Sequence, residues 1–240
     1  MGFFTDPNGP FTAVLRKISD IVFCNVIFCV LSLPVITIGA SLTGLSAAMQ
    51  LIAEDKEDDG QSAIKVFWTY FKKYFGRATL LWLCGLAGGA FLFLYYRVVS
   101  RMEGGAGYLY RVTFYALVLI FLSGYQYVFP MLARFGYSVK IALRNAWLMA
   151  IAALPWTLLG LSIPTATVVI TFFLRPESFS GAVFFWAIIG FALTAYLNAL
   201  VYLKAFHRIE PQSDKKDDYK DLDDARYLEK ITNRNKKDSE

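Results

Sequence analysis

Five long stretches of this chain contain no Asp, Glu, Lys, Arg or His. They are residues 21–53, 78–96, 112–133, 147–174 and 182–203. A transmembrane helix needs about 20 apolar residues to cross roughly 30 Å of hydrocarbon, and each stretch is about that long or longer. Because lipid offers no partner to an unpaired backbone N–H or C=O, we expect closed helices. The sequence therefore predicts an all-α, polytopic helical membrane protein with about five transmembrane helices.

The composition supports one membrane domain followed by a tail. Hydrophobic residues make up 56% of the 240 residues, and the mean hydropathy is +0.45. We expect a transmembrane helical domain over residues 1–208 and a charged cytoplasmic tail over residues 209–240, disordered or partly helical, since it cannot build a core alone. The net charge of +5 fits a membrane surface better than nucleic acid, because no reading motif accompanies it.

The basic residues predict which side faces the cytoplasm, since positively charged loops are retained there. With five crossings, six of the 24 basic residues fall on the first side and eighteen on the other. We therefore expect a multi-pass protein of the bacterial cell membrane with a cytoplasmic C-terminus and an extracellular N-terminus. Arg16 and Lys17 directly flank the first stretch and oppose this orientation. A re-entrant hairpin broken at Pro34 would satisfy both signals and leave four crossings.

The first stretch carries the most specific pattern, Ser32-Leu33-Pro34 followed by Thr37 and Gly39. Proline removes a backbone donor, so the helix must kink or break there. The freed carbonyls need partners, and the start of a second half-helix would present a positive dipole to an anion. Polar residues elsewhere in the stretches could join such a site or form interhelical hydrogen bonds. The candidate polar site comprises Asn25, Ser32, Pro34, Thr37, Gly39, Gln126 and Asn198.

Small residues four positions apart predict close helix packing. The pairs most relevant here are Ala40 with Gly44 and Gly85 with Gly89. Their partner could lie within the chain or in another subunit, including a second copy. Prolines at 155 and 164 predict a bent or tilted helix over residues 147–174, with a flexible gating helix as the alternative.

Residues 63–75 combine aromatic and lysine side chains at helical spacing after a capping serine. Such an amphipathic helix would lie in the membrane interface, with its rings at the headgroup level and its lysines near anionic lipid. Docking of a cytoplasmic partner is the alternative. The residues concerned are Lys65, Trp68, Phe71, Lys72, Lys73 and Phe75. Residues 137–147 repeat the order of serine, lysine and a helix that runs into a span.

The pattern of Gly9, Arg16, Asp20 and Asn25, then Ser32-Leu33-Pro34 with Thr37 and Gly39, resembles the YesL-like family of bacterial membrane proteins. The resemblance covers residues 1–208 and is strongest in the first quarter. It implies a multispan membrane protein whose genes accompany carbohydrate ABC importers and their sensor kinases. It implies no catalytic or binding residue.

The sequence contains no recognisable catalytic motif. It has one His, no zinc-ligand spacing, no G-x-S-x-G turn and no phosphate-binding Gly-rich loop, and its three dispersed cysteines read as small core residues. We therefore expect no catalytic residue, cofactor or metal. We expect a non-enzymatic accessory or assembly component of a carbohydrate ABC importer, in contact with lipid and importer subunits. The alternatives are a modulator of a sensor kinase and a small secondary transporter or channel with a midplane site.

Overall fold

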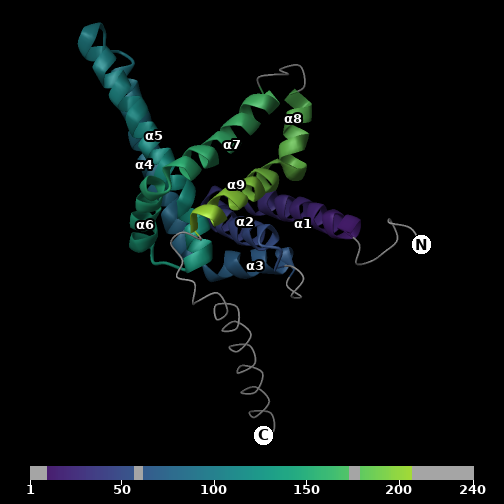
Figure 1. Cartoon of the computed structure of the whole chain (residues 1–240). Coiled ribbons are helices and arrows are strands. Elements are labelled where there is room, and N and C mark those ends of the chain that lie inside the picture. The colour runs from purple at the N-terminus through teal and green to yellow at the C-terminus, as the bar shows by residue number, and fades with distance from the viewer. Residues whose placement is uncertain (1–9, 57–61, 173–178, 207–240) are drawn as a thin grey trace, which may run out of the picture. The chain divides into compact units, whose positions relative to one another are not determined.

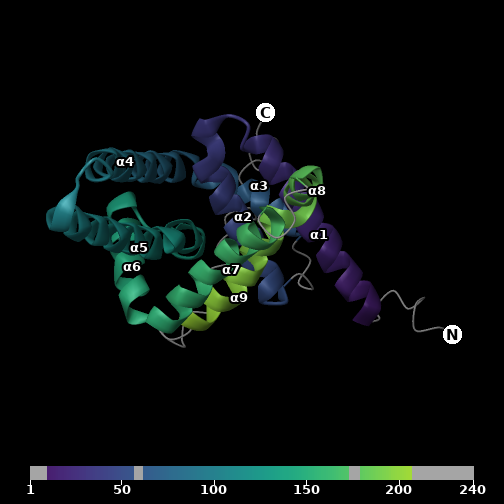
Figure 2. The same ribbon diagram turned by 90° about the horizontal axis from the view of Figure 1, so that it is seen from above.

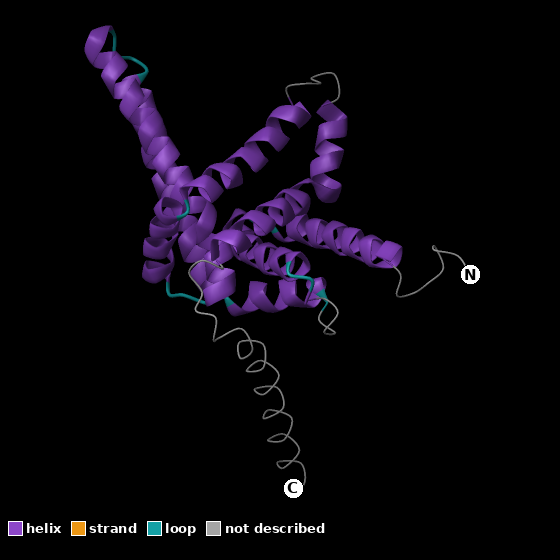
Figure 3. Cartoon of the chain, in the orientation of Figure 1, coloured by secondary structure: helices purple, strands orange, loops and turns teal. Residues whose placement is uncertain are grey.

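The computed structural model describes residues 10–56, 62–172 and 179–206. Within these ranges every regular element is helical and no strand occurs, which confirms the all-α prediction (Figure 3). The elements are α1 (Pro10–Leu31), η1 (Val35–Thr37), α2 (Ile38–Ala53), α3 (Ala63–Lys73), α4 (Phe75–Val99), α5 (Gly104–Phe135), α6 (Val139–Ala152), α7 (Leu154–Phe172), α8 (Phe179–Phe185), the π-helix η4 (Trp186–Gly190) and α9 (Phe191–Phe206), labelled in part in Figure 1.

Five helical segments are long and apolar enough to cross a membrane. They are Val35–Ala53, Phe75–Val99, Gly104–Phe135, Leu154–Phe172 and Phe179–Phe206. The chain divides into a unit from Met1 to Lys204 and a unit from Ala205 to Glu240, and the packing described below is that of the first unit. The charged tail expected after residue 208 lies outside the described residues.

The first uncharged stretch folds as a hairpin of two helices. Helix α1 ends at Leu31, the chain turns, and η1 leads directly into α2. The Thr37 hydroxyl closes the turn against the carbonyl oxygens of Leu31 and Pro34, 2.7 Å from the latter. At the other end, the Lys17 ammonium pairs with the carboxylate of Asp55, just beyond α2. The start of α1 and the end of α2 therefore lie together, so the two helices are antiparallel.

This geometry corrects the expectation of one continuous, kinked span over residues 21–53. The predicted break at Pro34 is present, and it reverses the chain as the hairpin alternative requires. The number of membrane crossings stays a prediction. The physical reason is that two separate helices can bury α2 against several neighbours, which a single long helix could not do. Of the two, only α2, together with η1, is a candidate span.

Helix α2 is the most enclosed of the candidate spans. In its apolar window 67% of the residues are buried, against 11% for α4. Two glycines explain how its neighbours approach. A Cβ at Gly39 would lie 2.7 Å from the Cβ of Trp82 and against the backbone of Ala78, both in α4. A Cβ at Gly44 would lie 2.8 Å from the carbonyl oxygen of Phe67 in α3.

Helix α3 is amphipathic, as predicted, but its apolar face packs on protein. Phe67 is fully buried and Phe71 is 9% exposed, so Phe71 belongs to the core and not to a docking surface. This corrects the sequence-based expectation for Phe71, and the reason is the space that Gly44 leaves on α2. Trp68 remains 44% exposed, with the Lys72 ammonium 5.1 Å from its ring centroid, and Phe75 is 38% exposed.

Helices α4 and α5 form a long antiparallel pair whose outer half extends away from the other helices in both views (Figures 1 and 2). Gly85 packs against the ring of Tyr125, and Gly88 against the ring of Phe121. Gly89, the predicted partner of Gly85 in packing, has no heavy atom within 4 Å of where a Cβ would stand. The close approach within the chain therefore uses Gly85 and Gly88, and Gly89 faces away from it.

The stretch 147–174 breaks into α6 and α7 at Ala153. Pro155 lies in the first turn of α7, where a missing N–H costs little. The buried Thr157 hydroxyl lies 2.9 Å from the carbonyl oxygen of Ala150 and 3.1 Å from that of Ala153, so it satisfies the end of α6. The predicted bend is thus a break at Pro155, whereas Pro164 lies inside the continuous helix α7.

Replacing Gly39 by Leu should destabilise the protein by more than about 2 kcal/mol, because the new side chain meets the backbone of α4 with no room to relax. The matched control is Gly76→Leu, since Gly76 has no heavy atom within 4 Å of a Cβ. Thermal unfolding in detergent measures both. Equal losses in the two variants would contradict the close packing of α2 on α4.

Candidate functional site

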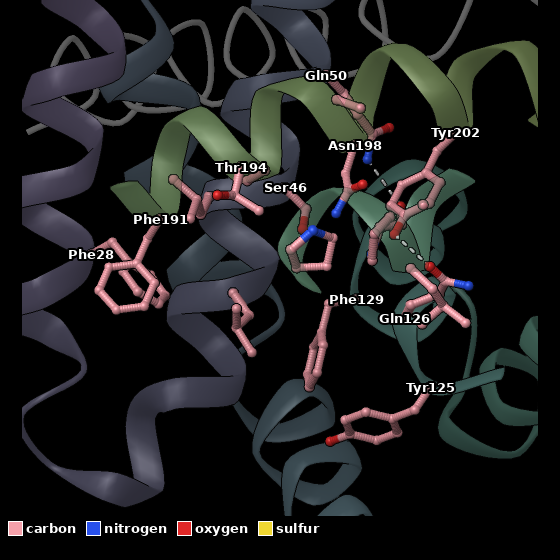
Figure 4. A pocket seen from close by; sticks show the side chains of 18 of the residues that line it. Phe28, Ser46, Gln50, Tyr125, Gln126, Phe129, Phe191, Thr194, Asn198 and Tyr202 are labelled. Atoms are coloured by element: carbon pink, nitrogen blue, oxygen red, sulfur yellow. Dashed lines mark hydrogen bonds between the residues drawn. The ribbon is translucent and has the colours of Figure 1, made fainter. Parts of the chain in front are cut away.

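A cavity of about 420 Å³ lies among α2, α5, α7 and α9 (Figure 4). Its walls are mostly apolar, with aromatic rings from Phe28, Tyr125, Phe129, Trp186 and Phe191. None of its lining residues is charged. Its polar lining residues are Ser46, Gln50, Gln126, Thr194, Asn198 and Tyr202. The cavity therefore offers neutral hydrogen-bonding groups inside an apolar chamber.

Gln126 ties three helices together at one side of the cavity. Its Nε2 donates to the carbonyl oxygen of Thr157, 3.1 Å away, and its Oε1 accepts from the Tyr202 hydroxyl at 3.1 Å (Figure 4). Gly160 makes this junction possible, because a Cβ there would lie 2.8 Å from the Gln126 Oε1. The Tyr127 hydroxyl adds a bond of 3.0 Å to the Thr157 hydroxyl. The amide predicted as an interhelical group thus joins α5 to α7 and α9.

Gln50 joins α2 to α5, and the sequence reasoning missed it. Its side chain is 6% exposed, and its Nε2 donates to the carbonyl oxygen of Pro130 at 3.1 Å. The signal that could have found it is the one used for the other amides, an amide side chain inside an uncharged stretch. Ser46, Thr194 and Tyr202 were missed in the same way.

Asn198 differs from these two amides. Its Oδ1 is buried and has no hydrogen-bond partner among the described residues. Figure 4 shows its side chain pointing from α9 into the space between Ser46 and Tyr202. An unpaired buried acceptor is unfavourable, so this atom is a position where a ligand group would be stabilised.

Asn25 is fully buried and forms hydrogen bonds with the backbone of the irregular segment of the last candidate span. Its Nδ2 donates to the carbonyl oxygens of Trp186, at 3.1 Å, and Ala187, at 2.7 Å, while its Oδ1 accepts from the backbone N–H of Ala192 at 2.9 Å. Trp186 and Ala187 belong to the π-helix η4 and Ala192 follows it, and the wider turn of η4 disturbs the regular hydrogen bonding. Asn25 does not line the cavity, but it fixes the turn that places Trp186 there.

The remaining members of the predicted polar site lie at the hairpin turn. Ser32, Pro34, Thr37 and Gly39 do not line the cavity. The backbone of α4 occupies the space beside Gly39, so the anion expected at the start of α2 has no room there. The Thr37 hydroxyl is engaged with the turn itself. The structure therefore brings Gln126 and Asn198 together and separates them from the Pro34 motif.

Charged residues gather at one end of the bundle. The Glu54 carboxylate, with a side chain only 9% exposed, lies 2.6 Å from the Lys56 ammonium and 2.8 Å from the Arg134 guanidinium. Burial alone would raise the pKa of Glu54, but the hydrogen bonds and charges of Lys56 and Arg134 outweigh burial and hold this pKa below its ordinary value. In addition, Arg77 donates to the carbonyl oxygen of Gly136 at 2.9 Å.

Glu54→Gln should lower stability at pH 7 by about 1–3 kcal/mol, because it leaves Arg134 without its carboxylate. Since the pKa of Glu54 is lowered on folding, the carboxylate stabilises the fold above its ordinary value of 4.5 and ceases to do so as the pH falls through the folded value. Thermal unfolding between pH 7 and pH 3 measures this. The difference in melting temperature between the variant and the original protein should become smaller as the pH falls. Glu103→Gln, at an exposed position, is the control. A difference independent of pH would refute the pairing.

A comparison with protein families matches residues 21–96 to a family described as "Protein of unknown function, DUF624". The match spans the end of α1, the hairpin turn, α2, α3 and most of α4. YesL-like proteins belong to that family, so the similarity seen in the sequence holds at this level. Neither the curated proteins nor the solved structures gave a match. Among the described residues, no group of three or more His, Cys, Asp or Glu side chains could hold a metal ion.

Proposed function

We propose that this chain is a non-enzymatic integral membrane protein that works by contact, as an accessory or assembly component of a bacterial carbohydrate ABC importer. The carbohydrate context comes from the resemblance to YesL-like proteins. The contact mechanism comes from the structure of the α4–α5 pair, and this is the observation that carries the proposal. A modulator of a sensor kinase would use the same surface, so the identity of the bound protein distinguishes the two.

The outer half of the α4–α5 pair offers a large surface to a membrane partner. Only 11% of the apolar window of α4 is buried, and Ala87 and Ala90 are exposed on either side of the open position at Gly89. Small residues let a second helix approach closely within lipid. Aromatic rings cluster near the tip, with Phe114 stacked 6.1 Å from Tyr95. Rings of this kind favour the membrane–water interface.

The charged end of the bundle supports a cytoplasmic location for both ends of the chain. The described basic residues at this end are Arg16, Lys17, Lys56, Lys65, Lys72, Lys73, Arg77, Arg134, Lys140, Arg144 and Lys204, whereas Arg97, Arg101 and Arg111 lie towards the α4–α5 connection. Positively charged segments are retained in the cytoplasm. The hairpin begins and ends at this side, and four further spans return to it. We therefore propose a cytoplasmic N-terminus in place of the extracellular one expected for five crossings.

Cysteine labelling tests this orientation. In a background without Cys24, Cys29 and Cys84, an impermeant maleimide should label Arg101→Cys in intact cells, because the α4–α5 connection faces outward. Thr5→Cys and Lys72→Cys should react only after lysis. Labelling of Thr5→Cys in intact cells would place the N-terminus outside. That result would favour five crossings and contradict the proposed orientation.

Co-purification in mild detergent tests the contact mechanism. Importer subunits should accompany the original protein and the Gly76→Leu control. Gly89→Leu should lose them, since its side chain projects from α4 into space that no described residue fills. Gly85→Leu is not equivalent, because it would meet Tyr125 and disturb the fold. Retention of the partner by Gly89→Leu would rule out this face as the contact.

The cavity favours a second candidate, a small transporter or channel. It lies beside the π-helix η4, which interrupts the last candidate span, and discontinuous helices of this kind line the binding sites of transporters. Liposomes that contain this chain alone provide the test. Sugar flux across them would support the transporter, and its absence together with co-purifying importer subunits would support the accessory component.

A further inference from the structure

The cavity has the size and lining of a small-molecule site. Its volume of about 420 Å³ falls within the range of roughly 300–1,000 Å³ that is common for ligand pockets. A charged ligand would lose its hydration there and find no opposite charge, because no lining residue is ionised. The rings of Phe129 and Trp186 instead suit an apolar body. The occupant should therefore be uncharged.

Three amides reach the cavity wall, and the protein itself uses two of them. Gln50 donates to the carbonyl oxygen of Pro130. Gln126 donates to Thr157 and accepts from Tyr202, so both ends of its amide are engaged. Of the three amides, only Asn198 has a buried atom, its Oδ1, without a partner in the described part of the chain. Asn198 is therefore the cavity amide whose buried acceptor is available to a ligand.

We propose that the cavity binds an uncharged amphiphilic molecule, whose apolar body lies along the aromatic wall and whose hydroxyl group bonds to Asn198. A hydroxyl suits an amide because it can donate to Oδ1 and accept from Nδ2. Thr194 lies one turn earlier on α9, and its hydroxyl donates to the carbonyl oxygen of Gly190, so it can only accept from the ligand. The site does not depend on the proposed importer partnership, because all its groups come from this chain.

Three probes of matched chain length test the proposal on the purified full chain in detergent. Decan-1-ol offers a hydroxyl, 1-methoxydecane offers no donor, and decanoate is charged. A ligand that binds only the folded state raises the melting temperature. Decan-1-ol should raise it by a few degrees more than either other compound. Equal shifts from all three would mean simple partitioning into apolar surface and would overturn the proposal.

Two variants locate the effect. Asn198→Leu removes the hydrogen-bonding group at similar size, and it should lower the affinity for decan-1-ol about fivefold and abolish its advantage over the ether. Ala195→Phe fills the cavity and should abolish binding of both. The control Ala152→Phe adds the same ring at an exposed site on α6, outside the cavity lining, and should leave the shifts unchanged. If Asn198→Leu keeps the preference for the alcohol, Asn198 is not the binding group and the proposal fails.

The natural occupant comes either from the membrane or from a pool of free metabolites. Organic extraction of protein purified from cell membranes, followed by mass spectrometry, separates the two sources. A neutral hydroxylated lipid or metabolite that is present in the original protein and absent from Ala195→Phe would support the site. Recovery of charged phospholipids alone, in equal amounts from both proteins, would count against it.

Discussion

The reversal of the chain at Pro34 is the constraint on which the rest of the structure depends. Because α1 turns back at this point, α2 lies in the centre with α1, α3, α4 and α5 around it. Thr37 stabilises the hairpin at its turn, and the Lys17–Asp55 pair joins the two helices at the open end of the hairpin. The same reversal brings Glu54 to Arg134, so most of the described charged groups gather at one end of the bundle.

Side chains satisfy the backbone at three places where a helix is interrupted. Thr37 serves the turn at Pro34, Thr157 serves the end of α6, and Asn25 serves the π-helix η4. Because lipid offers no water to hydrogen-bond an unpaired backbone group, such side-chain partners are needed at membrane depth. The polar residues of the uncharged stretches are thus mainly structural. Among the amides that line the cavity, Asn198 is the one whose buried acceptor has no partner in the described ranges, and this marks the cavity as a place for a ligand.

The sequence predicted the helices well because the absence of charge over twenty residues leaves lipid few alternatives. It also predicted the break at Pro34, since proline lacks a donor. It could not decide between kink and hairpin, because the answer depends on contacts such as Gly39 with Ala78 that are distant in the chain. The burial of Phe71 was missed for the same reason, as an amphipathic face can rest on lipid or on protein.

The candidate site was only partly predictable. Amides in apolar stretches were correctly singled out as polar groups within the bundle, but the sequence could not say which would meet. Gln126 and Asn198 face one cavity, whereas Asn25 serves the backbone near Trp186. Gly88, and not Gly89, pairs with Gly85, because the position of the Phe121 ring on α5 decides which small residue is covered.

The hairpin itself can be tested by the distance between its two ends. Spin labels at Ser19 and Ala53, in a background without the native cysteines, can be measured by double electron–electron resonance in lipid. Adjacent antiparallel helices pack about 8–10 Å apart, so the account predicts a separation of roughly 20 Å or less including the label arms. A continuous helix between these positions would place them about 50 Å apart, and that result would contradict the account.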